Sequence, residues 1–111
     1  MSSHPWEVDP VDLRDDLASE DPPLLVDCRE AGELAVASLE MAMHVPMAEI
    51  RSRLPELEEH IDRPVVVMCH HGVRSLQVVA FLREAGFEEA RSLAGGIDRW
   101  SVEIDPAVPR Y

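Results

Sequence analysis

Residues 65–75 read VVVMCHHGVRS, and this stretch decides the fold. Its first four residues, Val65–Met68, are apolar and mostly β-branched, which predicts a buried strand. Apolar residues at a helical spacing follow over 75–85, and Gly86 stands just past their end. The stretch therefore predicts a strand, a tight loop and a helix, with the Cys69 thiol at the first position of the loop.

The predicted loop has the residue types of an anion-binding turn. Gly72 suits a point where the backbone takes a positive φ, so that consecutive N–H groups converge on one centre. The helix dipole and the Arg74 guanidinium add positive charge, and Ser75 is expected to cap the helix. These features favour a thiolate, so we expect the pKa of Cys69 to lie below the ordinary value of about 8.5. The loop therefore predicts a nucleophile.

Short apolar runs and helical patterns alternate along the rest of the chain. Asp9 and Pro10 are expected to begin a helix as its N-cap and first residue. The other expected elements are a buried strand over 24–28, helical turns over 31–37, a strand at 43–45, a helix over 47–60 divided by Pro55, a strand at 91–93 and a short helix at 97–100. This alternation predicts a three-layer α/β domain with a parallel sheet. Ligands bind beyond the carboxyl ends of such strands, where Cys28 and Cys69 both stand.

The composition is that of one ordinary globular domain. The 111 residues are 46% apolar and 29% charged, with no repeat or linker, so we expect a single domain over 1–111. The formal net charge is −12 and the chain has no Lys, which argues against nucleic acid as a partner. No run approaches the ~20 apolar residues of a membrane span, and no signal-peptide pattern is present. We therefore expect no membrane partner and a cytoplasmic location.

The histidines and the second cysteine leave alternatives open. His70 and His71 would support the thiolate, bind a substrate oxygen or point to solvent. A metal site made by Cys69 and these histidines is disfavoured, because adjacent loop residues rarely face one metal and no ligand spacing completes a set. We expect no metal and no cofactor. Cys28 is either a resolving thiol within reach of Cys69 or a small apolar core residue, and the second interpretation is favoured.

Three ordered motifs resemble those of the rhodanese family and extend across nearly the whole chain. They are LVDCRE at 25–30, the loop pattern Cys69-x-x-Gly72-x-Arg74-Ser75, and LAGGIDRW at 93–100. The resemblance implies a three-layer α/β sandwich with a central, mostly parallel five-stranded sheet. It also implies a sulfurtransferase, in which Cys69 takes a sulfane sulfur from thiosulfate or a related small sulfur-containing anion. The Cys69 persulfide would then pass this sulfur to cyanide, a thiol or a protein.

The resemblance and the loop chemistry together assign roles to individual residues. Cys69 and Arg74 are expected to be catalytic, and Asp27 is expected to organise the site. Contact with the substrate is expected for the rest of the loop and for one further arginine, namely His70, His71, Gly72, Val73, Ser75 and Arg29. Arg29 has an alternative, an ion pair with a neighbouring carboxylate such as that of Asp27, and this structural role is favoured.

Two other functions share these motifs in part. A phosphatase or arsenate reductase of the same fold has a longer loop between its Cys and Arg. Here only residues 70–73 separate Cys69 from Arg74, and the shorter ring suits a sulfur atom. A non-catalytic binding or regulatory domain usually lacks the cysteine, which this chain keeps. One departure from the family pattern lies in residues 37–42, where Met41 stands in place of the usual glycine.

Overall fold

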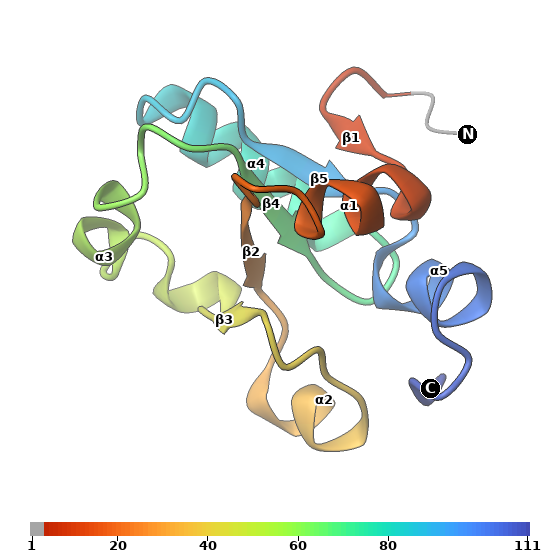
Figure 1. Cartoon of the computed structure of the whole chain (residues 1–111). Helices are drawn as coiled ribbons and strands as arrows, with labels where there is room; N and C mark the ends of the chain where they lie inside the picture. Colours follow the sequence, from red (N-terminus) through yellow and green to blue (C-terminus); the bar gives the residue numbers. More distant parts are fainter. Residues whose placement is uncertain (1–3) are drawn as a thin grey trace.

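Parallel pairing brings five short strands together in an order that differs from their order in the chain (Figure 1). The computed structural model describes residues 4–111. The strands are β1 (Glu7–Val8), β2 (Leu24–Asp27), β3 (Met43–His44), β4 (Val65–Met68) and β5 (Arg91–Leu93). They pair in the order β1-β5-β4-β2-β3, and each neighbouring pair is parallel. The α/β class is confirmed, and the sheet is fully rather than mostly parallel within the described residues.

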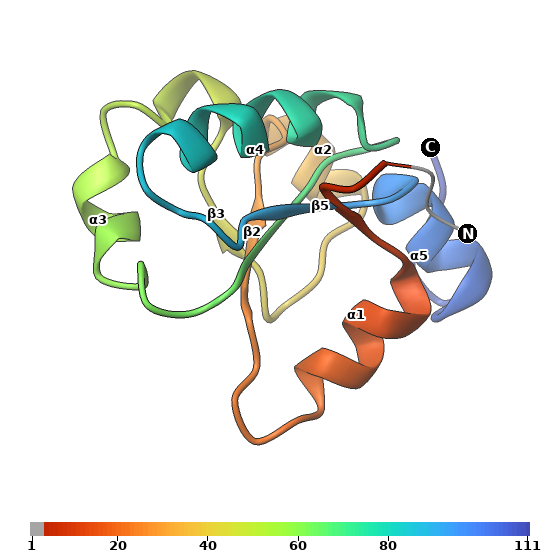
Figure 2. The same cartoon turned by 90° about the horizontal axis from the view of Figure 1, so that it is seen from above.

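Helices cover both faces of this sheet and complete three layers (Figure 2). One core lies between the sheet and α3 and α4, and includes Val67 and Val79. The other lies between the sheet and α1 and α5, and includes Leu13, Val66 and Trp100. The helices are α1 (Pro10–Leu17), α2 (Ala31–Val36), the 3-10 helix η1 (Met47–Glu49), α3 (Leu54–Glu58), α4 (Val73–Glu84) and α5 (Gly96–Glu103).

The two central strands, β2 and β4, end level with each other. Their register pairs Asp27 with Met68, and the Cys28 N–H donates to the Met68 carbonyl at 3.0 Å. Side chains alternate along a strand, so Cys28 and Cys69 follow on one face of the sheet, in the core beneath α4. The carboxyl edge of the sheet therefore brings the two thiols next to each other.

Some local expectations were wrong. Ser75 is not the N-cap of α4, because Gly72, with a φ of 97°, turns the chain into the helix sooner and α4 begins at Val73. Pro55 does not divide a helix; it is the second residue of α3, where a missing N–H costs nothing, and the interruption falls at 50–53. The two-residue strand β1 was missed, since so short a segment carries no periodic pattern.

The prediction for the amino-terminal segment falls partly on residues 1–3, which lie outside the described residues. Within residues 4–111, no helix is both long enough and apolar enough to cross a membrane. The 12-residue α4, for example, is well short of the ~20 residues that a spanning helix needs.

Candidate active site

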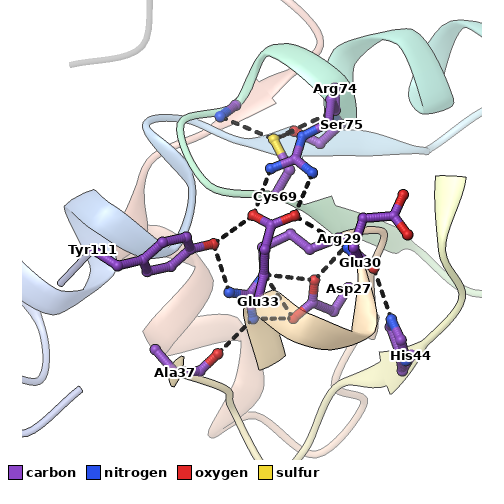
Figure 3. A network of polar contacts seen from close by, with 11 residues as sticks. Asp27, Arg29, Glu30, Glu33, Ala37, His44, Cys69, Arg74, Ser75 and Tyr111 are labelled. Carbon is purple, nitrogen blue, oxygen red and sulfur yellow. Dashed lines mark hydrogen bonds and ion pairs between the residues drawn. The ribbon is translucent and has the colours of Figure 1, made fainter. Parts of the chain in front are cut away.

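The loop between β4 and α4 surrounds the sulfur of Cys69 with hydrogen-bond donors (Figure 3). The Gly72 N–H donates to Cys69 Sγ at 3.1 Å and the Ser75 N–H at 3.4 Å. The positive φ of Gly72 makes this possible, because it starts α4 directly beside the sulfur. A Cβ at this position would also stand only 3.2 Å from the Gly95 nitrogen. The loop thus has the geometry of an anion-binding turn.

Two buried serine hydroxyls extend this network. Ser75 Oγ lies 3.3 Å from Cys69 Sγ and 2.6 Å from Ser92 Oγ, which comes from β5. As a thiol, Cys69 donates to Ser75; as a thiolate, it can accept from the Ser75 hydroxyl, which then accepts from Ser92. Cys69 is only 1% exposed, so these hydroxyls replace much of the water that would solvate the anion.

The contacts make Cys69 an acidic thiol. Its pKa is lowered from 9.0 to about 5, first by a hydrogen bond with Cys28; burial opposes the shift, and Ser75 and Gly72 lower the pKa further. The pKa of Cys28 is raised by the same hydrogen bond and by burial. At neutral pH the pair therefore consists of a Cys69 thiolate and a protonated Cys28 thiol that stabilises it.

The amino end of α5 holds the loop from its other side. The Ile97 N–H donates to the Cys69 carbonyl at 2.9 Å, and the Asp98 N–H donates to the His70 carbonyl at 3.2 Å. Gly96 permits this approach, because a Cβ there would stand 2.4 Å from both carbonyl oxygens. The motif at 93–100 therefore acts on the site through the backbone of the loop.

Glu33 of α2 holds the guanidinium of Arg74 (Figure 3). Arg74 Nη1 and Nη2 donate to the two carboxylate oxygens at 2.6 and 2.8 Å. This hydrogen-bonded pair lowers the pKa of Glu33 to about 2 and raises the pKa of Arg74, so both groups stay charged near neutral pH. The Cys69 thiolate also raises the Arg74 pKa. An anionic substrate would therefore meet an arginine that already has a carboxylate partner.

Asp27 and Arg29 form a buried ion pair behind the site. Arg29 Nη2 donates to Asp27 Oδ2 at 2.6 Å, and Nε donates to Asp27 Oδ1 at 2.9 Å. Arg29 also donates to the Ala37 carbonyl and the Tyr111 hydroxyl, each at 2.8 Å. Its side chain is 0% exposed, so these donors serve the interior in this structure. The arrangement is that of the structural alternative for Arg29, with Asp27 organising the junction of β2 and α2.

Tyr111 covers one side of the loop. Its ring stacks on His70 with the centroids 3.8 Å apart and the planes within 5°. Its hydroxyl donates to Glu33 Oε2 at 2.7 Å and accepts from Arg29. Tyr111 therefore connects the loop, the Arg74 partner and the buried ion pair.

Of the other predicted site residues, two contact the sulfur and two point to the solvent. Gly72 and Ser75 contact the sulfur directly. The side chain of His71 is 61% exposed and Val73 is 68% exposed, so both point outward. Among the described residues, no three His, Cys, Asp or Glu side chains converge so that they could hold a metal ion.

Sequence reasoning gave no site role to Glu33, Ser92 or Tyr111. Glu33 lies 41 residues from Arg74 in the chain, and Ser92 lies 17 residues from Ser75. Ser92 could have been found, because a strand that pairs with β4 must bring its own end near Cys69. The positions of Glu33 and Tyr111 carry no such signal, since neither residue lies in a strand.

The Cys69 thiol is acidic, lies at the carboxyl edge of a parallel sheet and is enclosed by N–H donors at a helix start. These features are those of an α/β domain with a cysteine nucleophile. The sequence model described as the Rhodanese-like domain matches residues 9–103, most of the chain. The chain belongs to this family.

Individual relatives agree with this assignment. A sulfurtransferase of Allochromatium vinosum is 37% identical over 95 residues, covering 86% of this chain and 87% of that protein. The adenylyltransferase and sulfurtransferase MOCS3-2 of Zea mays is 33% identical over 96 residues, covering 82% of this chain and 20% of that protein. The chain thus spans about a fifth of the length of this relative. The human single-domain sulfurtransferase TSTD1 superposes with a TM-score of 0.74 at 26% identity, covering 90% of this chain and 98% of that one.

Proposed function

We propose that the chain is a sulfurtransferase that carries a sulfane sulfur on Cys69 as a persulfide. The observation that carries the proposal is the acidic Cys69 thiol among the Gly72 and Ser75 donors. A thiolate is the form that attacks sulfur, and donors that stabilise it also suit a terminal persulfide anion in the same loop. Membership of the Rhodanese-like domain family supports the same reaction.

The proposed reaction has two steps. The Cys69 thiolate attacks the outer sulfur of thiosulfate, the S–S bond of the donor breaks, and sulfite leaves with the electron pair. An acceptor, which is cyanide, a thiol or a protein, then attacks the outer sulfur of the persulfide and displaces the Cys69 thiolate. A thiol with a pKa of about 5 is an effective leaving group, so Cys69 serves both steps, and neither needs a metal or cofactor.

In this proposal, different residues around Cys69 contact different parts of the substrate. Gly72 and Ser75 bind the transferred sulfur, and Arg74 binds the charged end of the donor in competition with Glu33. His71 and Val73 form the exposed rim of the loop that the donor crosses, and His70 lies between His71 and Tyr111 beside it. Arg29 acts from behind the site, where it holds the Asp27 carboxylate in place.

Thiosulfate and related small sulfur-containing anions are the proposed donors, and neither nucleic acid nor a membrane is proposed as a partner. A chain of this length with only two cysteines lacks the disulfide framework of a small secreted domain, which fits a reducing compartment. The cytoplasm is therefore the proposed location.

The first test is the intact mass of the purified protein after brief incubation with thiosulfate and then with cyanide, with thiocyanate measured in parallel. We expect the mass of one sulfur to be gained on Cys69 and then removed by cyanide as thiocyanate. Cys69→Ser is the matched control and should gain no sulfur. Failure of every sulfane donor to modify the wild-type protein would refute the proposal, and phosphatase and arsenate reductase assays would follow.

A further inference from the structure

We propose that Cys28 resolves the Cys69 persulfide, releasing the outer sulfur as hydrosulfide and leaving a Cys28–Cys69 disulfide. This activity rests on the proposed function, since it begins from the persulfide. It differs from transfer because no sulfur acceptor takes part. A small thiol or a dithiol protein then reduces the disulfide and restores both cysteines.

The register of the sheet places the two cysteines side by side. Asp27 pairs with Met68, and the Cys28 N–H continues the ladder to the Met68 carbonyl at 3.0 Å. Cys28 and Cys69 directly follow this last pair, at the point where the two parallel strands, about 4.8 Å apart, end. Disulfide-bonded Cα atoms lie about 4.4–6.8 Å apart, so the bond needs no separation or sliding of the strands.

Both thiols share one dry environment. They belong to the same buried core beneath α4, and each residue is 1% exposed. The carbonyl of Cys28 accepts from the Met47 N–H at 2.9 Å, so its backbone is held on both sides. A thiol fixed beside the reacting sulfur has a large advantage over a thiol that must diffuse into a closed site.

The placement of the donors favours attack on the inner sulfur of the persulfide. Cys28 approaches Cys69 Sγ from β2, whereas the Gly72 and Ser75 N–H groups approach it from the start of α4. The outer sulfur is stabilised as an anion by those N–H groups, so it is drawn toward α4 and leaves on that side. Attack on the outer sulfur would merely move the persulfide to Cys28.

The step is balanced without an external oxidant. The Cys28 sulfur bonds to Cys69 Sγ, the persulfide S–S bond breaks, and the outer sulfur leaves with the electron pair. The proton of the Cys28 thiol passes first to the anionic outer sulfur, so the attacking group is the Cys28 thiolate and the protonated outer sulfur leaves as hydrosulfide. The sulfane sulfur is reduced to sulfide, and the two cysteine sulfurs are oxidised to the disulfide.

The test follows intact mass and hydrosulfide after the fully reduced chain is mixed with thiosulfate in the absence of any acceptor or reductant. In the wild-type protein we expect a transient gain of one sulfur, then a product lighter than the starting protein by two hydrogens, with one equivalent of hydrosulfide. Non-reducing peptide mapping should find Cys28 linked to Cys69. In Cys28→Ser the persulfide should form and should release hydrosulfide at least ~100-fold more slowly.

Each other outcome has a separate meaning. A persulfide equally stable in wild type and Cys28→Ser overturns the inference and leaves the proposed function standing. No added sulfur in either protein overturns the proposed function itself. A disulfide that forms equally fast without thiosulfate, or a persulfide found on Cys28, also overturns the inference. The wild-type peptide map decides the matter even if the variant folds poorly.

Discussion

The low pKa of Cys69 comes first from Cys28, and this contribution is measurable. With a pKa of about 5, the ultraviolet absorbance of the thiolate should be complete at neutral pH and should fall as the pH drops through about 5, because protonation removes the anion. In Cys28→Ala the midpoint should move up toward the ordinary value of about 8.5, since the largest lowering interaction is lost. Cys28→Ser keeps a donor and should titrate near wild type.

A variant without Cys69 supplies the blank for this titration. The remaining thiol of Cys69→Ser is Cys28, whose pKa is still raised by burial, so no thiolate absorbance should appear between acid and neutral pH. A midpoint for Cys28→Ala that equals the wild-type value would show that the serine and backbone donors suffice to hold the thiolate.

In the proposed function Glu33 competes with the donor for Arg74, so neutralising Glu33 should improve donor binding. Glu33→Gln keeps an acceptor for the Glu30 N–H in the capping box of α2, and removes the charge that pairs with Arg74. We expect the KM for thiosulfate to fall about tenfold, corresponding to about 1.4 kcal/mol, with little change for an uncharged sulfane donor. Arg74→Gln should raise the thiosulfate KM. Equal KM values for Glu33→Gln and wild type would mean that Arg74 does not contact the donor.

For single residues, the sequence could predict those whose roles depend only on their neighbours in the chain. The positive φ of Gly72 and the thiol at the loop start follow from a strand, a turn and a helix that are consecutive in the chain. Ser75 was predicted in the loop, but its capping role was wrong because Gly72 begins α4 sooner, and its contact with Ser92 of another strand was not predicted. Glu33 and Tyr111 depend on how distant segments pack, which no local pattern encodes.

The elements themselves were largely predictable, since apolar strands and helical spacings alternate clearly along the chain. The site forms because two of these strands, β2 and β4, end level with each other, and the loops that follow them carry Cys28 and Cys69. Their exact register could not be obtained from the pattern, yet it is what makes Cys28 the neighbour of Cys69. Cys28 is buried in the core, as the favoured interpretation expected, and the pattern gave no sign that it lowers the pKa of the Cys69 thiol.

The contact between α5 and the active-site loop gives a test at the scale of elements. Gly96→Ala places a Cβ 2.4 Å from the Cys69 and His70 carbonyl oxygens, so the loop must move away from α5. We expect sulfur uptake from thiosulfate to slow at least ~100-fold and the free energy of unfolding to fall by ~1–3 kcal/mol. Gly32→Ala is the control, because its Cβ meets nothing within 4 Å and Ala favours a helix. Wild-type uptake by Gly96→Ala would show that this contact does not position the sulfur.

Across the whole molecule, the Asp27–Arg29 pair joins β2, the segment after α2 and Tyr111. Arg29→Met should lower the free energy of unfolding by ~3–5 kcal/mol, because it leaves the Asp27 carboxylate buried without a counter-ion. Arg14→Met breaks the exposed pair with Asp15 and should cost less than ~1 kcal/mol. Urea denaturation measures both values. If the free energy of unfolding falls equally in the two variants, the buried pair stabilises the fold no more than the exposed pair does.

In the proposed function an anionic donor meets the field of a protein with a net charge of −12 before it reaches Arg74. At low ionic strength the whole protein repels thiosulfate, whereas at ~0.15 M salt charges beyond about 8 Å are largely screened. We therefore expect kcat/KM for thiosulfate to rise about two- to fivefold from ~0.01 to ~0.15 M salt. An uncharged sulfane donor should show no such rise, which separates steering from effects on the thiolate. If kcat/KM for thiosulfate falls with salt instead, the local field of Arg74 outweighs the charge of the whole molecule, and the Glu33 carboxylate shields Arg74 less than its two short hydrogen bonds indicate.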